Sequence, residues 1–318
     1  MHEKKYMEVR VNSMNHFDTL IRAYSDQPRD VDRYIYRGVS DESFNLLPSI
    51  YRSQQNSKNP IVAEYMTLVE SKNNISDLKH MRFFHNLLYK FTVYSNQNGL
   101  TVNSSKYRNS MNKDFKKMRE IGFVDEIESN TLVFPGIDTL SDLSTLQHYG
   151  VPTDLLDFSF DLYTALYFSI KPILVDFCEN KCDASFLSNK NIALWIIDTS
   201  TLDRGFNENG IAIKTYVPNY SSNPNLYAQK GVFLYCLRKV TSKSNYVINP
   251  FEEIISSTKN YASDLLTKIV IPATFIPLLY NRITYWGYGA DRLFPGYYGI
   301  EQRIREDIII QKIADGLV

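Results

Sequence analysis

The stretch TLQHYGVPTDLLDFSFDLYTALYFS, residues 145–169, carries a turn, a strand and a helix in immediate succession. Gly150 and Pro152 are typical of a sharp turn. The short apolar run LLDFS that follows predicts a strand, and the spacing after it predicts a helix with one buried face, for which Asp161 is the expected N-cap. The residues of that face are Leu162, Ala165, Leu166 and Ser169. This strand and helix are expected to belong to the core.

Two polar residues distinguish the strand of this stretch. Successive side chains of a strand point to opposite faces, so Asp157 and Ser159 share one face while Leu156 and Phe158 take the other. Polar groups beside an apolar strand need hydrogen-bond partners. They satisfy each other, or they form the wall of a ligand site.

The turn before this strand adds three more candidates. His148 is a candidate general acid or base because the imidazole pKa lies near neutrality, although such a histidine is more often a hydrogen-bonded turn residue. Thr153 can cap or bind the backbone of the turn, and Tyr149 lies beside it.

A second segment, VDRYIYRGVS at 31–40, predicts a strand with Arg37 at its centre. Gly38 would let another group approach the backbone closely. An arginine there is costly to bury unless it meets an anion. Either its head reaches solvent, Asp32 or Asp41, or it lines a cleft and binds a phosphate or carboxylate.

The remaining pattern mixes strands and helices without regular alternation. Strands are expected at 192–200 and in IAIKTYVP, GVFLYCLRK and KIVIPATF, and helices at 60–95 with a break at 72–76, in KDFKKMREIGF, at 138–148 and in the tail. The fold class is therefore α+β, with a mixed or antiparallel central sheet flanked by helices. One domain is expected at 31–318, with an N-terminal extension at 1–30 and a helical insert at about 60–125.

The composition sets broad limits. The chain has 318 residues with 35 basic and 35 acidic side chains, so bulk charge gives no attraction to nucleic acid or membrane. Its N-terminus is charged rather than apolar and no window is long enough to cross a bilayer, so a cytoplasmic protein without a membrane partner is expected. Cys178 and Cys182 lie four residues apart, but further ligands are not close by, and no metal is expected.

Gln229 precedes a Lys-Gly step and an apolar strand in NLYAQKGVFLY. The sequence has no G-x-S-x-G, P-loop, G-x-G-x-x-G or H-E-x-x-H motif. These absences disfavour a serine hydrolase and the common nucleotide-binding and zinc-protease motifs.

Together, YIYRGVSDESFNLLPSIYR, LQHYGVPTDLLDFSFDLYTALYFS and NLYAQKGVFLY resemble the FRG domain, a bacterial module named for its Phe/Tyr-Arg-Gly motif. The tail DRLFPGYYGIEQRIR is similar to the family's closing segment, so the resemblance spans about 33–305. It implies a place among mobile-element and phage-defence proteins. The chain has Asp154 and Gly296 where the family usually has Arg and Asp, and no basic residue at 225–227, so a site built on those charges is expected to be weaker or differently tuned.

The order of these motifs is also similar to the ADP-ribosyltransferase fold with its Arg-Ser-Glu signature. That resemblance implies that Arg37 binds the phosphates or ribose of NAD, and that Ser159 orients the arginine and the nicotinamide ribose. The third position falls to Gln229, or to Glu301 later in the chain. It also implies stacking on nicotinamide by an aromatic residue, with Tyr149, Tyr163 and Phe168 as candidates.

Three function classes follow. The first is transfer of ADP-ribose from NAD to a protein or nucleic acid, or NAD hydrolysis by a toxin-like effector, with His148 or Asp157 as base. The second is a regulatory module that binds a nucleotide or a phage component without catalysis and signals to a partner subunit. The third is a nuclease or other hydrolase built on Asp157, His148 and Glu301.

Overall fold

The computed structural model describes residues 6–25, 33–52, 58–70, 73–100, 132–179, 184–202, 205–207, 209–241, 244–257 and 265–316. Its main sheet has the strand order β1-β10-β6-β2-β5-β8-β4, and β7 also pairs with β8. Apart from the parallel pair β1–β10, the neighbours are antiparallel. The strands are Met7–Arg10 (β1), Tyr34–Val39 (β2), Val133–Phe134 (β4), Leu156–Ser159 (β5), Asn191–Asp198 (β6), Ile211–Tyr216 (β7), Gly231–Lys239 (β8) and Leu266–Pro272 (β10). The α+β class and the mixed sheet are confirmed.

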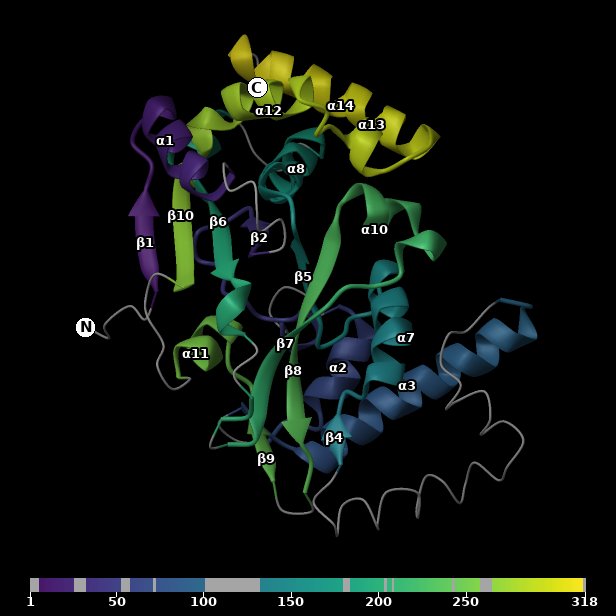
Figure 1. Cartoon of the computed structure of the whole chain (residues 1–318). Coiled ribbons are helices and arrows are strands. Elements are labelled where there is room, and N and C mark those ends of the chain that lie inside the picture. Colours follow the sequence, from purple (N-terminus) through teal and green to yellow (C-terminus); the bar gives the residue numbers. More distant parts are fainter. Residues whose placement is uncertain are drawn as a thin grey trace.

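Helices gather in two groups around this sheet (Figure 1). One group comprises α1 (Met14–Ser25), α8 (Leu162–Cys178), α9 (Ala184–Ser188), α12 (Ile276–Tyr285), α13 (Ala290–Leu293) and α14 (Tyr297–Ala314). The other comprises α2 (Pro60–Met66), α3 (Asp77–Gln97) and α7 (Ile137–His148), and β3 (Asn74–Ser76) pairs with β9 (Asn245–Val247) nearby. Two further short α-helices are α10 (Pro224–Ala228) and α11 (Phe251–Ser256), and short 3-10 helices lie at Ser49–Tyr51, Thr199–Thr201, Tyr220–Ser222 and Ala273–Phe275.

Side-chain alternation along β6 explains why both faces of the sheet are covered. Leu194 and Ile196 pack in the cluster formed with α8, α12 and α14, whereas Ala193, Trp195 and Ile197 pack in the cluster that includes α11. A strand buried on both faces is expected to be continuously apolar. The uninterrupted run of this strand is thus accounted for.

The opening stretch folds as the sequence predicts. Residues 156–159 form β5, and Asp161 caps α8 by accepting hydrogen bonds from the backbone amides of Tyr163 and Thr164 at 2.9 and 3.1 Å. The predicted buried face of α8 is buried throughout. Pro172 lies inside this helix without ending it.

The segment expected as an N-terminal extension contributes to the main sheet. Its β1 pairs with β10, and Phe17 and Ile21 of α1 are buried in the cluster around α8. It is therefore part of the core rather than an appendage, because its apolar side chains fill the edge of the sheet. The preceding residues 1–5 lie outside the described part of the chain.

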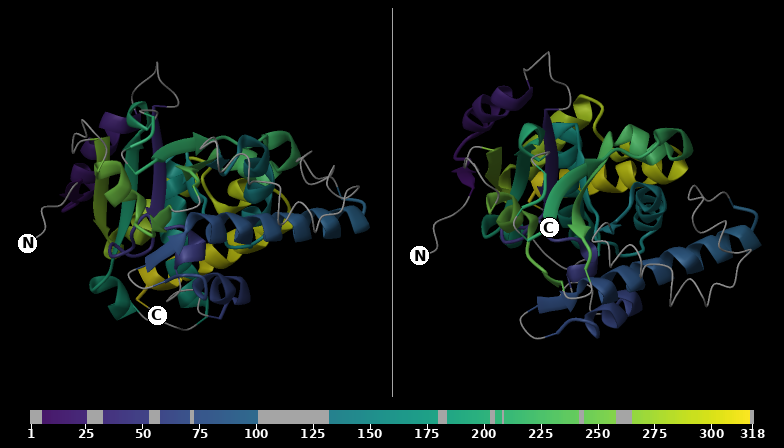
Figure 2. Two further views of the ribbon diagram at one scale, coloured as in Figure 1. Left: turned by 90° about the horizontal axis from the view of Figure 1, so that it is seen from below. Right: turned by 60° about the horizontal axis from the view of Figure 1, so that its bottom comes forward.

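The expected helical insert is described at 58–70 and 73–100. Its two helices are separated near the predicted break, where β3 intervenes, and they pack with α7 and β8 around Tyr65, Phe84, Leu143 and Phe233. The long helix α3 reaches away from the sheet (Figure 2). The charged helix expected in KDFKKMREIGF lies outside the described residues.

Candidate functional site

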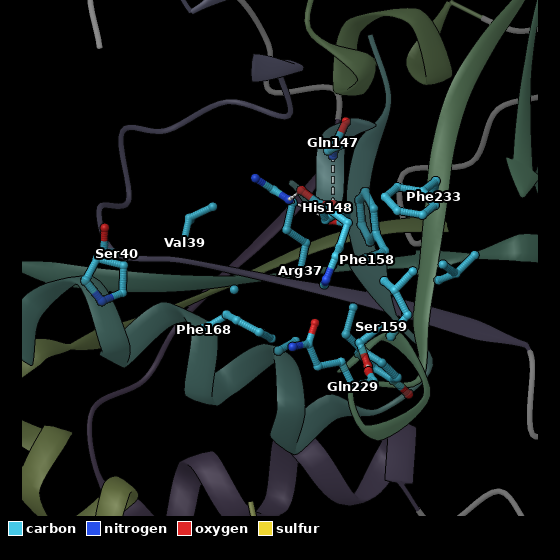
Figure 3. Close-up of a pocket in the computed structure, with 18 of the residues that line it drawn as sticks. Arg37, Val39, Ser40, Gln147, His148, Phe158, Ser159, Phe168, Gln229 and Phe233 are labelled. Atoms are coloured by element: carbon cyan, nitrogen blue, oxygen red, sulfur yellow. Dashed lines mark hydrogen bonds and ion pairs between the residues drawn. The ribbon is translucent and has the colours of Figure 1, made fainter. Parts of the chain in front are cut away.

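A cavity of about 580 Å³ opens where β2, β5 and β8 lie side by side, and this volume is within the usual range of small-molecule sites. It is bordered by α8, by the end of α7 and by the segments around α10 and α13 (Figure 3). Its polar and charged lining residues are Arg37, Ser40, Arg52, Gln147, His148, Asp157, Ser159 and Gln229, and its aromatic ones are Tyr36, Phe44, Phe158, Phe168, Phe233 and Phe294.

Arg37 enters this cavity from the middle of β2. Its guanidinium donates a hydrogen bond to the backbone oxygen of Asp157 at 2.6 Å and lies 3.8 Å from the carboxylate of that residue. Burial lowers the pKa of Arg37 to about 10, which Asp157 opposes and the nearby Arg52 reinforces. The side chain stays charged at neutral pH, and its buried Nε has no hydrogen-bond partner. The structure therefore supports the alternative in which Arg37 lines a cleft. Of the two aspartates considered as partners, Asp41 pairs with Lys190, and Asp32 lies outside the described residues.

Ser159 and Gln229 meet at the end of β5. The Ser159 hydroxyl donates to the backbone oxygen of Gln229 at 2.7 Å and accepts from the amide of Asp161 at 2.9 Å. Strand register places Ser159 opposite Tyr36 of β2 and Gly231 of β8, so it links the two neighbouring strands. Through these contacts Ser159 stabilises the turn at Gln229.

The side chain of Gln229 lies in the cavity with Arg37 and Ser159 (Figure 3). Its Nε2 donates to the backbone oxygen of Leu293 at 3.0 Å, just before the lining residue Phe294. Gln229 thereby joins the turn before β8 to the C-terminal helices. An amide there carries no charge, so it offers hydrogen bonding without the electrostatic effect of a carboxylate.

Three polar side chains are linked along the turn of the opening stretch. The buried hydroxyl of Thr153 donates to Oε1 of Gln147, and Nε2 of Gln147 donates to the Asp157 carboxylate at 2.7 Å. The Thr153 hydroxyl also accepts from the amide of Leu155 at 3.2 Å. Thr153 is therefore not among the lining residues; it positions Gln147, which in turn orients Asp157.

His148 lies at the C-terminal end of α7 and lines the cavity. Partial burial lowers its pKa below 6.5, with the charge of Asp157 acting in the opposite direction. The imidazole is therefore mostly neutral at pH 7 and able to accept a proton. Its ring also contacts Tyr149 edge-on, at 5.1 Å between centroids.

Gly38 has a packing role. A Cβ at this position would lie 1.8 Å from the backbone oxygen of Ala165 in α8. The predicted close approach is confirmed, and the group that approaches is the α8 backbone. The glycine contributes to the cavity by letting α8 sit directly on β2.

Besides Thr153, three further expected site residues lie outside the lining. Tyr149 is 77% exposed, and Tyr163 packs against Trp286 and Tyr288. Glu301 lies on the exposed side of α14, where it pairs with Arg305. Helical geometry separates them from the cavity: Tyr163 is on a different side of α8 from Phe168, which does line it. The structure therefore does not bring Tyr149, Tyr163 or Glu301 into the cavity, where stacking or a catalytic carboxylate was expected of them.

Sequence reasoning missed Arg52 and most of the aromatic lining. Arg52 ends the motif segment LLPSIYR, and Phe294 belongs to the tail segment RLFPG. The resemblance to family motifs in both segments was the signal that could have identified these two residues. That both line the same cavity depends on the path of the chain between distant segments, which a local pattern does not encode.

Among the described residues, no group of three or more His, Cys, Asp or Glu side chains could hold a metal ion. Cys178 is exposed at the end of α8, and Cys182 lies outside the described ranges. Within the same described part of the chain, no helix combines the length and apolar character needed to span a membrane.

Comparison with known proteins gives one match. Residues 32–176 match the family model described as FRG domain, which is a little less than half of the chain. It covers β2, β5 and most of α8, and therefore Arg37, His148, Asp157 and Ser159. Searches of curated proteins and of solved structures give no match.

Proposed function

We propose that this FRG-domain chain consumes NAD: it binds NAD in the cavity around Arg37 and transfers ADP-ribose to a macromolecule or to water. One observation carries the proposal. Arg37, Ser159 and Gln229, which come from β2, from β5 and from the turn before β8, line one cavity. They follow the chain order in which the ADP-ribosyltransferase signature places Arg, Ser and Glu.

Binding of NAD follows from the lining. The charged fork of Arg37 is suited to a phosphate of the dinucleotide, and its buried Nε has a free donor to offer. Phe158, Phe168 and Phe294 offer flat apolar surfaces for a ring. Of the aromatic residues expected to stack on nicotinamide, Phe168 is the one that reaches the cavity.

The reaction would break the bond between the ribose C1′ and the nicotinamide nitrogen, and nicotinamide would leave with the bonding electrons. Positive charge then develops on the ribose, where a fixed carboxylate stabilises the transition state. Asp157 is the one carboxylate among the described lining residues. The acceptor oxygen or nitrogen forms the new bond to C1′ and loses its proton to His148 or Asp157.

A second candidate is a nucleotide-binding regulatory module that does not turn NAD over. The observation in its favour is Gln229, an amide at the third position whose Nε2 is already bonded to the backbone of Leu293. In this case binding of a nucleotide or a phage component would be passed to a partner through the C-terminal helices. For either candidate, we propose a role in bacterial phage defence, which rests on the family resemblance.

The test is incubation of the purified chain with labelled NAD and bacterial lysate, beside Arg37→Ala. We expect release of nicotinamide, with or without label on macromolecules, to fall at least 100-fold in Arg37→Ala because the phosphate loses a charge-assisted bond in the transition state. Arg305→Ala is the matched control: this arginine is exposed and pairs with Glu301 outside the cavity.

Each outcome decides between the candidates. Equal nicotinamide release by wild type and Arg37→Ala contradicts the transferase assignment. Saturable NAD binding that Arg37→Ala abolishes, without release of nicotinamide, supports the regulatory module. Absence of both binding and turnover contradicts the assignment of the cavity to NAD.

A further inference from the structure

A second cavity of about 530 Å³ adjoins the first. Arg37, Val39, Phe44 and Arg52 line both, so these four side chains form the partition between them. The far side of the second cavity mixes apolar and amide groups; it is lined by Ser43, Asn45, Leu47, Tyr51, Met66, Asn73, Ile248 and Pro250. Each cavity falls within the range of about 300–1,000 Å³ typical of small-molecule sites.

Two like charges meet at this partition. Arg52 lowers the pKa of Arg37 through repulsion, after the larger effect of burial, and burial also lowers the pKa of Arg52. Asp157 favours the charge of both guanidinium groups. This single carboxylate, whose side chain is 59% exposed, opposes two guanidinium charges. The partition thus keeps a net positive charge.

The hydrogen-bond donors at the partition are incompletely satisfied. The Nε atoms of Arg37 and Arg52 are both buried and both lack a hydrogen-bond partner in the protein. Buried donors without a partner are costly, more so when they are charged. Anionic oxygens of a bound ligand would satisfy both and would relieve the repulsion between the two arginines.

We propose that Arg52 and Arg37 together hold the diphosphate of a nucleotide, one phosphate each, with the two ends of the ligand in the two cavities. This inference rests on the proposed function in taking the occupant to be a nucleotide. It adds Arg52 and the second cavity as a binding site. It also defines the ligand class, a nucleoside diphosphate extended on its far phosphate, as in NAD, rather than a mononucleotide.

Calorimetric titration of the purified chain with AMP, ADP and NAD tests this inference. The wild type should bind ADP and NAD at least about tenfold more tightly than AMP, because a second phosphate gains a second charge-assisted contact. In Arg52→Ala this preference should fall to within about threefold. Arg52→Lys, which keeps the charge but loses the planar fork, should be intermediate. Arg305→Ala should behave as wild type.

Three results would overturn the inference. An unchanged preference for ADP over AMP in a folded Arg52→Ala variant excludes a phosphate contact. Equal affinity of the wild type for AMP and ADP excludes a binding site for a diphosphate. Displacement of ADP by a single-stranded oligonucleotide at far lower concentration than by NAD assigns the partition to a nucleic-acid backbone.

The titrations, together with the nicotinamide-release assay on Arg52→Ala, separate this inference from the proposed function. Nicotinamide release that Arg52→Ala leaves unchanged would uphold the transferase and reject the role of Arg52. Tighter binding of ADP than of AMP that depends on Arg52, without nicotinamide release, would support the diphosphate-binding site and reject the transferase.

Discussion

Asp154, at the position where the resemblance to the FRG domain led us to expect arginine, is buried. Its carboxylate lies 3.3 Å from Nε2 of the buried His80. Arg238 donates to the hydroxyl of Tyr51 at 3.0 Å and stacks over the ring of Tyr246 at 3.2 Å. The exchange therefore changes a buried cluster, and it leaves the charge of the cavity lining to Arg37, Arg52 and Asp157. Asp154 does not line the cavity, so its location gives no reason for weaker binding there.

Protonation of His80 should limit stability in acid. Burial, together with Arg238, lowers its pKa to about 4 despite the opposing Asp154. Between pH 6.5 and about 4 the unfolded chain therefore binds a proton that the folded chain does not, so stability falls as pH falls through this window. Complete titration corresponds to about 3 kcal/mol.

The measurement is the free energy of unfolding in urea at pH 6.5 and 4.5, for wild type and His80→Gln. The loss between the two pH values should be smaller in the variant. Glu252 acts in the opposite sense, because burial raises its pKa to about 7 and stability is lost as pH rises from 4.5. Glu252 is present in both proteins, so its contribution to the pH dependence cancels when the two are compared. Equal pH dependence of the two would contradict the role of His80.

A methyl group at position 38 should destabilise the fold. Gly38→Ala places a Cβ against the backbone of α8, which cannot rotate away as a side chain could. We expect a loss of about 3 kcal/mol or more in the free energy of unfolding. Gly136→Ala is the control, since a Cβ there has no heavy atom within 4 Å, and it should cost under about 1 kcal/mol. Similar losses in the two variants would contradict the close contact.

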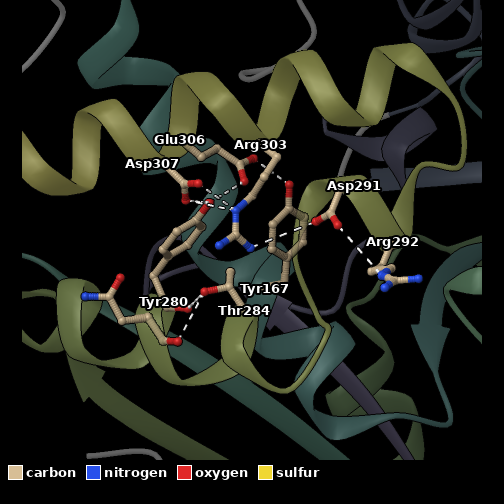
Figure 4. A network of polar contacts seen from close by, with 9 residues as sticks. Tyr167, Tyr280, Thr284, Asp291, Arg292, Arg303, Glu306 and Asp307 are labelled. Carbon is tan, nitrogen blue, oxygen red and sulfur yellow. Dashed lines mark hydrogen bonds and ion pairs between the residues drawn. The ribbon is translucent and has the colours of Figure 1, made fainter.

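At the scale of elements, a buried polar network fixes the C-terminal helices on α8 (Figure 4). The hydroxyls of Tyr167 on α8 and Tyr280 on α12 donate to Glu306 on α14, at 2.5 and 3.0 Å. Burial raises the pKa of Glu306. Lys171 of α8 lies 3.8 Å from the ring centroid of the lining residue Phe294. Since Phe294 lies between α13 and α14, the network also holds one wall of the cavity.

Removing one acceptor from this network should be measurable. Glu306→Gln replaces one of the two acceptor oxygens by an amide nitrogen, and Tyr280 keeps a second acceptor in Asp307 at 3.1 Å. We therefore expect a loss of about 1–2 kcal/mol in urea unfolding. Glu301→Gln on the same helix removes an exposed pair with Arg305 and should cost under about 1 kcal/mol. An effect of Glu306→Gln no larger than that of Glu301→Gln would show that the network does not stabilise the helix contact.

At the scale of the whole molecule, the strand order assembles the site. More than a hundred residues separate Arg37 from Ser159, and seventy separate Ser159 from Gln229. Arg37 lies in β2, Ser159 in β5 and Gln229 in the turn before β8, and these three strands are consecutive neighbours in the sheet. The C-terminal helices then return over α8 to supply Phe294. The cavity therefore needs β8, the turn before it and the segment between α13 and α14, as well as the residues of the matched family segment.

The sequence by itself determined the local elements and the candidates within them. Periodicity, turn residues and a capping aspartate place β5 and α8, the apolar run places β6, and the motifs single out Arg37, Ser159 and Gln229. These features depend on interactions between near neighbours in the chain, so they are readable without the fold. The similarity to ADP-ribosyltransferases in function stays a prediction.

Only the tertiary structure decided which side chains face the cavity and which serve packing. It turned Gly38 and Thr153 into structural supports, removed Tyr149, Tyr163 and Glu301 from the lining, and buried Asp154. It also brought in Arg52 beside Arg37. The physical reason is that these outcomes depend on strand order and helix packing between segments far apart in the chain, for which no local pattern exists.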